Sequence, residues 1–197
     1  MRISSPGVAV VVLAGGEGSR IGGAKPTRMV AGTTLIDRSL KIAKSWSDEI
    51  AIAVRSPDQI GQTDACTIAD AEGVEGPLAG LIASLRWAKT RREALLTIPC
   101  DMPFLPWDLP DRLVAGLGES MAAVAASGDR LHPVCALWRV EALSLSEDYA
   151  ASGRRSLHGF AEHVGFSRVM WPDVPRDPFF NVNSASDLAV AEAALGA

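Results

Sequence analysis

The chain has 197 residues, of which 48% are hydrophobic and 21% charged, and its formal net charge is −4. This length suits one domain, residues 1–197, and so hydrophobic a chain can bury enough surface to fold. The mildly acidic balance lacks the basic excess of a nucleic-acid-binding protein, and no apolar run approaches the roughly 18 residues that a membrane span requires.

Apolar runs and helical spacings alternate along the chain. The first run, 8–13, is rich in valine and ends before a glycine pair, which favours a strand buried on both faces. Pro77 suits the first turn of a helix whose apolar residues continue to position 88. The other strands are predicted at 49–54, 66–69, 94–98, 121–126, 132–139 and 166–170, and the other helices at 34–46, 108–117, 156–164 and 185–195.

This alternation predicts an α/β fold. Strands separated by helices imply right-handed crossovers between parallel strands, so a largely parallel sheet is expected. The later part is less regular, and the strand at 132–139 is expected to run antiparallel. Pro172, Pro175 and Pro178 make the stretch before the last helix a loop.

The three cysteines, Cys66, Cys100 and Cys135, are widely spaced and odd in number. They therefore form neither a disulfide framework nor a CxxC metal site. A reducing, cytoplasmic compartment is the simplest interpretation.

A glycine-rich loop, Leu13-Ala-Gly-Gly-Glu-Gly-Ser-Arg-Ile-Gly-Gly-Ala-Lys-Pro26, follows the first strand. Its glycines allow backbone N–H groups to approach an anion closely, and Arg20 and Lys25 supply cations that can meet phosphate oxygens. A proline after Lys25 excludes the Walker pattern, and Ile21 stands where the dinucleotide-binding fingerprint requires glycine. The alternative is a flexible turn with two solvated cations.

Two carboxylates follow predicted strands. Asp101 comes just after the strand at 94–98, and Asp70 ends the strand at 66–69. Ligands of open α/β sheets bind at the carboxyl edge of the strands, and a carboxylate there suits Mg²⁺. The alternatives are an ordinary turn residue for Asp101, which lies near two prolines, and a cap or turn residue for Asp70.

The glycine-rich loop resembles the nucleotidyltransferase signature L-A-G-G-x-x-x-R-M-G-G-x-x-K, and within that superfamily the molybdenum cofactor guanylyltransferases. The resemblance continues in order through Gly76-Pro-Leu-Ala-Gly-Leu81, Pro99-Cys-Asp-Met-Pro-Phe-Leu-Pro106, His132-Pro-Val-Cys-Ala-Leu-Trp138 and Phe180-Asn-Val-Asn-Ser-Ala-Ser-Asp-Leu188. These blocks span nearly the whole chain. The resemblance implies a three-layer, Rossmann-like α/β fold of the nucleotide-diphospho-sugar transferase type.

The family transfers the GMP part of GTP to the terminal phosphate of molybdopterin cofactor, releases pyrophosphate and uses Mg²⁺. By resemblance, Lys25 and Arg20 meet the phosphates and Asp101 holds the metal, so these three residues are the predicted catalytic set. The predicted nucleotide-binding residues are Leu13, Ala14, Gly15, Gly16, Lys25, Asp70 and Asp101. The predicted acceptor-binding residues are Gly80, His132, Arg155, Asn181 and Asn183.

The acceptor-binding residues have competing interpretations. A lone histidine such as His132 is often structural, and Arg155, which follows another arginine, could belong to a solvated basic pair. Asn181 and Asn183 alternate with Val182, so both amides should point to one face of an extended segment. Either amide could equally cap the last helix.

Two residues depart from the family pattern. Ala24 stands immediately before Lys25, where the family usually has Asp or Asn. Ala53 stands near the end of the second strand, where the family usually has an asparagine close to the base. These departures leave the choice of base open.

Other functions therefore stay in view. The same chemistry could use another nucleotide or acceptor, as in a cytidylyltransferase of the same cofactor or a sugar-phosphate nucleotidyltransferase. A non-catalytic nucleotide-binding scaffold is the alternative from another class. The resemblance implies GTP and molybdopterin cofactor as substrates, and molybdoenzyme apoproteins or a cofactor-delivery protein as protein partners.

Overall fold

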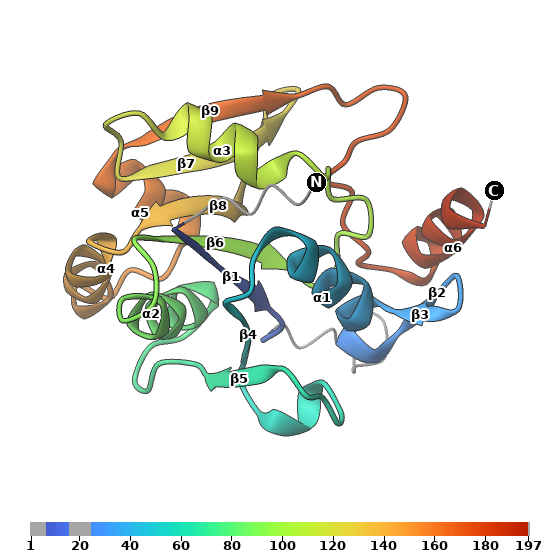
Figure 1. Cartoon of the computed structure of the whole chain (residues 1–197), viewed down its shortest axis with the longest axis horizontal. Helices are drawn as coiled ribbons and strands as arrows, with labels where there is room; N and C mark the ends of the chain where they lie inside the picture. Colours follow the sequence, from blue (N-terminus) through green and yellow to red (C-terminus); the bar gives the residue numbers. More distant parts are fainter. Residues whose placement is uncertain (1–6, 16–24, 197) are drawn as a thin grey trace.

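The computed structural model describes residues 7–15 and 25–196. Within them, seven strands form one sheet in the order β5-β4-β1-β6-β8-β7-β9 (Figure 1). The strands are β1 (Val8–Leu13), β4 (Ile50–Val54), β5 (Cys66–Ala69), β6 (Ala94–Pro99), β7 (Ala122–Ser127), β8 (Arg130–Arg139) and β9 (Phe166–Trp171). Only β8 runs antiparallel to its neighbours in this sheet, β6 and β7. The predicted mostly parallel sheet with a late antiparallel strand is confirmed.

Helices cover both faces of the sheet. They are α1 (Leu35–Trp46) and α3 (Leu109–Leu117) on one face, and α2 (Pro77–Ala88), α4 (Ala142–Ala151) and α5 (Leu157–Val164) on the other (Figure 1). In β1, Val10 and Val12 belong to the first core while Ala9 and Val11 belong to the second, as the two-residue period of a strand requires. The three-layer arrangement therefore buries β1 on both faces, as predicted.

Local chemistry sets where the helices begin. Helix α1 starts one residue later than predicted because Thr34 is its N-cap, with the Thr34 hydroxyl accepting from the Asp37 N–H at 3.1 Å. Ser156 caps α5 in the same way. Pro77 occupies the first turn of α2, as predicted, and Gly76 before it has φ of 75°, which favours glycine.

Helix α4 has no counterpart among the predicted elements. Its buried side chains are Ala142, Ser146 and Tyr149, at helical spacing but with a serine in the middle of the stripe. The Ser146 hydroxyl is satisfied by donating to the backbone carbonyl of Leu143 at 2.6 Å. Packing of α4 against α2 thus stabilises a helix whose apolar pattern is weak.

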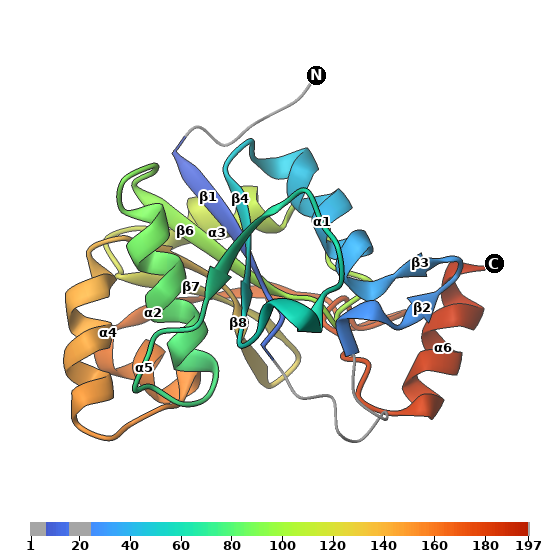
Figure 2. The same cartoon turned by 90° about the horizontal axis from the view of Figure 1, so that it is seen from below.

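A small unit lies at one end of the sheet (Figure 2). The hairpin of β2 (Met29–Val30) and β3 (Thr33–Thr34), which was also not predicted, packs against the C-terminal helix α6 (Ala185–Leu195). Val30, Val182 and Ala191 are buried in their shared core. The backbone N–H of Val182 donates to the carbonyl of Asp101 at 2.9 Å, so this unit ties the C-terminal segment to the loop after β6.

None of the helices in the part of the chain that the structure describes is long and apolar enough to cross a membrane. That residues 1–197 form a single domain stays a prediction.

Replacing Phe160 tests how tightly the face of the sheet covered by α2, α4 and α5 is packed. The Phe160 ring is fully buried and stacks on Trp138 at a centroid distance of 5.5 Å. We expect Phe160→Ala to lower the free energy of unfolding by about 3–5 kcal/mol, measured by urea denaturation. Val190→Ala, at a side chain that is 54% exposed on α6, should change it by less than about 0.5 kcal/mol. Equal effects of the two changes would contradict this description of the core.

Candidate active site

The site lies where the carboxyl ends of four strands meet. Strand β1 lies between β4 and β6, and the chain changes direction across the sheet at this point, which is where open α/β sheets bind ligands. The loops after these strands and the start of α2 enclose a cavity of about 230 Å³, called here the smaller cavity. It is lined by Leu13, Gly15, Ala53, Arg55, Asp70, Gly76, Pro77, Gly80, Pro99, Asp101 and Val134.

The Asp70 carboxylate occupies a narrow position in the smaller cavity. A Cβ atom on Gly15 would lie 3.1 Å from Asp70 Oδ2, and one on Gly80 would lie 3.3 Å from Oδ1. Glycine at both positions therefore leaves room for the carboxylate. Burial raises the pKa of Asp70 above its ordinary value, and the Arg55 guanidinium opposes that rise.

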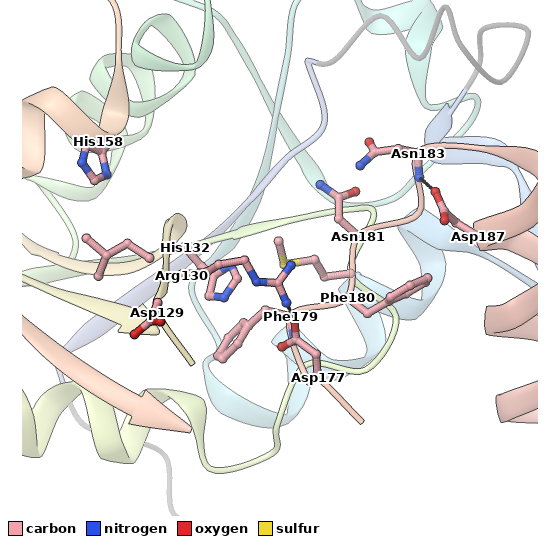
Figure 3. A pocket seen from close by; sticks show the side chains of 12 residues that line it. Asp129, Arg130, His132, His158, Asp177, Phe179, Phe180, Asn181, Asn183 and Asp187 are labelled. Carbon is pink, nitrogen blue, oxygen red and sulfur yellow. Dashed lines mark hydrogen bonds and ion pairs between the residues drawn. The ribbon is translucent and has the colours of Figure 1, made fainter. Parts of the chain in front are cut away.

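A second cavity of about 640 Å³, called here the larger cavity, is shown in Figure 3. Turns and loops between the later elements form most of its wall. It is lined by Met102, Asp129, Arg130, Leu131, His132, His158, Asp177, Phe179, Phe180, Asn181, Asn183 and Asp187.

His132 is fixed in the wall of the larger cavity. Its Nε2 lies 2.8 Å from the Ser127 hydroxyl, and its ring stacks on Phe179 at a centroid distance of 4.6 Å. Burial lowers the pKa of His132, while the Asp177 carboxylate opposes this and Arg130 adds to it. The imidazole is therefore neutral at pH 7 and contributes an aromatic surface rather than a charge.

Lys25 lies at the junction of the two cavities. Its ammonium group pairs with Asp101 and donates to Asn181 Oδ1 at 3.3 Å and to Asn183 Oδ1 at 2.8 Å. The three donors of the ammonium group are thus matched by three oxygen partners. The Lys25 and Asp101 side chains are 11% and 14% exposed, so this ion pair is largely removed from water. Asp101 lines the smaller cavity and the two amides line the larger one, which puts the positive charge between them.

Asp101 has an oxygen that is suited to a hard cation. While Oδ2 faces Lys25, Oδ1 is buried and has no hydrogen-bond partner among the described residues. Those residues contain no group of three or more His, Cys, Asp or Glu placed to hold a metal. Mg²⁺ does not need one, because it commonly takes one or two carboxylates together with water and substrate phosphate oxygens. This arrangement could therefore offer a phosphate two positive partners. One is the Lys25 ammonium group, and the other is a metal ion held by the Asp101 carboxylate.

The predicted site residues are grouped here by their place relative to the two cavities. The first group lines the smaller cavity and comprises Leu13, Gly15, Asp70, Gly80 and Asp101; the second, lining the larger cavity, comprises His132, Asn181 and Asn183, and Lys25 lies between the two. Gly80, assigned to the acceptor by resemblance, is thus beside Asp70. Ala14 is not in the lining of either cavity, and its N–H donates to the Ala53 carbonyl at 2.8 Å. Gly16 and Arg20, like the departure at Ala24, lie outside the described residues.

Arg155 lies outside the lining of both cavities. It forms an ion pair with Glu75, and its backbone is next to Gly76 at the start of α2. Its assignment to the acceptor stays a prediction.

The segment 181–183 behaves as its alternation predicts. The two Oδ1 atoms of Asn181 and Asn183 face the same ammonium group, while Val182 between them is buried. Helix α6 is capped instead by Ser184 and Asp187, whose side chains form a reciprocal capping box.

Part of the larger cavity is lined by residues that the sequence patterns did not predict. Asp177 accepts a hydrogen bond from the Phe179 N–H at 3.0 Å and pairs with Arg130, so it shapes the turn that carries Phe179 to His132. The available signal was the Asp-Pro-Phe-Phe run directly before the amide segment, where paired aromatic residues precede two predicted site residues.

Residues 10–164 match the sequence profile of a family described as "MobA-like NTP transferase domain". The chain is 39% identical over 196 residues to a molybdenum cofactor guanylyltransferase of Rhodopseudomonas palustris strain HaA2, covering 95% of this chain and 92% of that one. It is similar to the crystal structure of molybdopterin-guanine dinucleotide biosynthesis protein A from Archaeoglobus fulgidus, with a TM-score of 0.77, 26% identity, and coverage of 95% and 98%. It also matches 4-diphosphocytidyl-2C-methyl-D-erythritol synthase from Anaerococcus prevotii (TM-score 0.74, 16% identity, coverage 100% and 99%), which shows a shared fold alone.

The burial of Asp70 leads to a pH-dependent prediction. Because its pKa is raised in the folded state, that state binds the proton more tightly than the unfolded chain does, and stability falls as pH rises from about 4 through the folded pKa. Asp70→Asn removes this effect. We expect the variant to be more stable than the parent in urea denaturation at pH 7.

This difference should shrink as pH is lowered and should vanish below about 4, where the carboxyl group becomes protonated in both states. Asp64→Asn, at an exposed carboxylate of the loop before β5, is the control and should show little difference at either pH. An Asp70→Asn variant less stable than the parent at pH 7 would refute the prediction.

Proposed function

The chain belongs to the MobA-like NTP transferase family, and we propose on that basis that it is a molybdenum cofactor guanylyltransferase. It transfers the GMP part of GTP to the terminal phosphate of molybdopterin cofactor and releases pyrophosphate. Relatives with that name match it over nearly their full length. The observation that carries the proposal is the Lys25 ammonium group, held beside Asp101 at the junction of two cavities.

The smaller cavity suits the nucleoside end of GTP. Its walls are apolar except for a few groups, among them the Asp70 carboxylate, which can accept hydrogen bonds from the N–H donors of guanine. The Ala53 side chain in the same wall lacks the amide group that an asparagine would supply. This chain therefore has fewer side-chain groups to recognise the base than the family pattern implies. That observation keeps a cytidylyltransferase of the same cofactor as the second candidate.

The larger cavity suits the acceptor. Its volume of about 640 Å³ lies within the usual range of small-molecule sites. The His132–Phe179 stack gives it an aromatic wall, and Asn181 and Asn183 stand at the end nearest Lys25. Since their Oδ1 atoms face Lys25, their Nδ2 groups are donors that can hold the terminal phosphate of the acceptor.

In the reaction, an oxygen of the acceptor phosphate forms a bond to the α-phosphorus of GTP. The bond from the α-phosphorus to the bridging oxygen breaks, and its electron pair leaves with pyrophosphate. The Lys25 ammonium group stabilises the negative charge that develops on the α-phosphoryl oxygens. Because the attacking phosphate oxygen is already anionic, positioning by the two amides takes the place of a general base.

Asp101 is the residue that would hold Mg²⁺, through its unpaired Oδ1. A bound Mg²⁺ would neutralise phosphate oxygens of the nucleotide. Arg20 is proposed to contact the departing pyrophosphate. A molybdoenzyme apoprotein or a cofactor-delivery protein as partner, and a cytoplasmic location, remain predictions.

A panel of nucleotides tests the function. Purified protein is incubated with molybdopterin cofactor, Mg²⁺ and ATP, CTP, GTP or UTP separately, and pyrophosphate release is measured. We expect release with GTP to exceed that with every other nucleotide. Equal or greater release with CTP would replace the guanylyl assignment by the cytidylyl one. Binding of GTP without release of pyrophosphate from any nucleotide would identify a non-catalytic scaffold.

Asp101→Asn tests the metal ligand. The change keeps the shape of the side chain but removes its charge, so we expect pyrophosphate release to fall roughly hundredfold or more. Calorimetric titration should also lose the Mg²⁺ dependence of GTP binding. Asp64→Asn, at an exposed loop position, should retain parental values in both measurements. Full activity of Asp101→Asn at ordinary Mg²⁺ concentrations would show that the metal assignment is wrong.

A further inference from the structure

A short series of hydrogen bonds connects helix α6 to the Lys25 ammonium group. The Asp187 carboxylate accepts from the backbone N–H of Asn183 at 2.9 Å (Figure 3). It also accepts from the backbone N–H of Ser184 at 2.8 Å. The side chain of Asn183 then accepts from Lys25 at 2.8 Å. We propose that Asp187 is a positioning residue for Lys25, acting through Asn183. This inference rests on the proposed function only in its consequence for turnover.

One of the Asp187 bonds is not needed to cap the helix. The capping box consists of the Ser184 hydroxyl accepting from the Asp187 N–H at 3.1 Å and the Asp187 carboxylate accepting from the Ser184 N–H. The bond from Asn183 is additional and lies outside the helix. It fixes the backbone of the residue whose side chain makes the shorter of the two amide contacts with Lys25.

Among the described residues, few other contacts fix the backbone of Asn183. The core that α6 shares with the β2–β3 hairpin includes Val182 and Ala191 but not Asn183, so it holds the segment without setting the orientation of residue 183. Val182 is anchored by its burial and by its bond to the Asp101 carbonyl, but Asn183 itself is exposed. Without Asp187, rotation about the Asn183 backbone can therefore move its amide away from Lys25.

The charge of Asp187 agrees with this role. The hydrogen bond from the Asn183 N–H lowers the pKa of Asp187 most, bonds to Ser184 add to this, and attraction to Lys25 contributes as well. The group is thus anionic at neutral pH. It strengthens the hydrogen bond that orients Asn183, since bonds to ionised groups are about twice as strong as neutral ones.

Asp187→Ala and Ser184→Ala form a matched pair of variants. Each removes one half of the capping box, so both should lower the melting temperature by similar amounts. Only Asp187→Ala removes the bond to Asn183. We expect it to lower kcat for GTP-dependent pyrophosphate release roughly tenfold or more, with a smaller change in the KM for GTP. Ser184→Ala should keep kcat close to the parental value.

Asp187→Glu is the conservative variant. Glutamate is the usual residue at this position of a capping box, and its carboxylate can reach the same N–H groups. It should restore most of the kcat that Asp187→Ala loses. If Ser184→Ala lowers kcat as much as Asp187→Ala does, Asp187 acts only through helix stability and the proposal is overturned.

A second measurement does not depend on turnover. Acetylation of Lys25 by acetic anhydride, followed by mass spectrometry, reports how firmly the ammonium group is held. Asp187→Ala should raise the rate of labelling roughly fivefold, the factor that one hydrogen bond contributes, while Ser184→Ala should not. An unchanged rate in Asp187→Ala overturns the positioning role. A parent that labels as expected but releases no pyrophosphate contradicts the proposed function alone.

Discussion

The Lys25 ammonium group is buried between segments that are far apart in the sequence. Taking a charge out of water is unfavourable unless close partners compensate it. Here the compensation comes from the Asp101 carboxylate, after β6, and from two amides near the C-terminus. The rest of the site depends on this requirement, because the three segments must meet for the charge to be satisfied.

Several structural features serve that meeting. The bond from Val182 to the Asp101 carbonyl holds the amide segment against the loop after β6. The hairpin β2–β3 and helix α6 share a small core that includes Val30, Val182 and Ala191. This core keeps the segment after Lys25 close to the segment that carries the two amides. Ser39 of α1 donates to the Cys100 carbonyl at 3.3 Å, so the neighbouring helix supports the same loop.

The position of this charge accounts for how a protein of net charge −4 can act on two anionic substrates. A general attraction for anions is absent from the composition, and the local field has to supply it. In the proposed function, one cation shared by two cavities places its field where the two substrate phosphates come together. In the smaller cavity, the Asp70 carboxylate lies between Gly15 and Gly80 although burial disfavours its charge, which agrees with the nucleotide-binding role proposed for it.

The sequence by itself determined the layered α/β architecture and most of the residues at the sheet edge. Strands such as 8–13 carry continuous apolar runs because both faces are buried, and Asp70 and Asp101 are recognisable because they directly follow strands. The alternation of Asn181 with Asn183 likewise specified a common face. These features are local, since strand period and strand ends can be read within a few residues.

Only the tertiary structure decided which of these residues meet. The contact between Lys25 and Asn183 spans 158 positions, and no local pattern encodes it. Helix α4 and the hairpin β2–β3 also escaped prediction, because one has a serine in its buried stripe and the other has strands of two residues. The places of Gly80 beside Asp70 and of Arg155 outside both cavities likewise depend on the folded structure rather than on any local pattern. Burial and partner choice depend on packing between distant segments, which the chain acquires only when it folds.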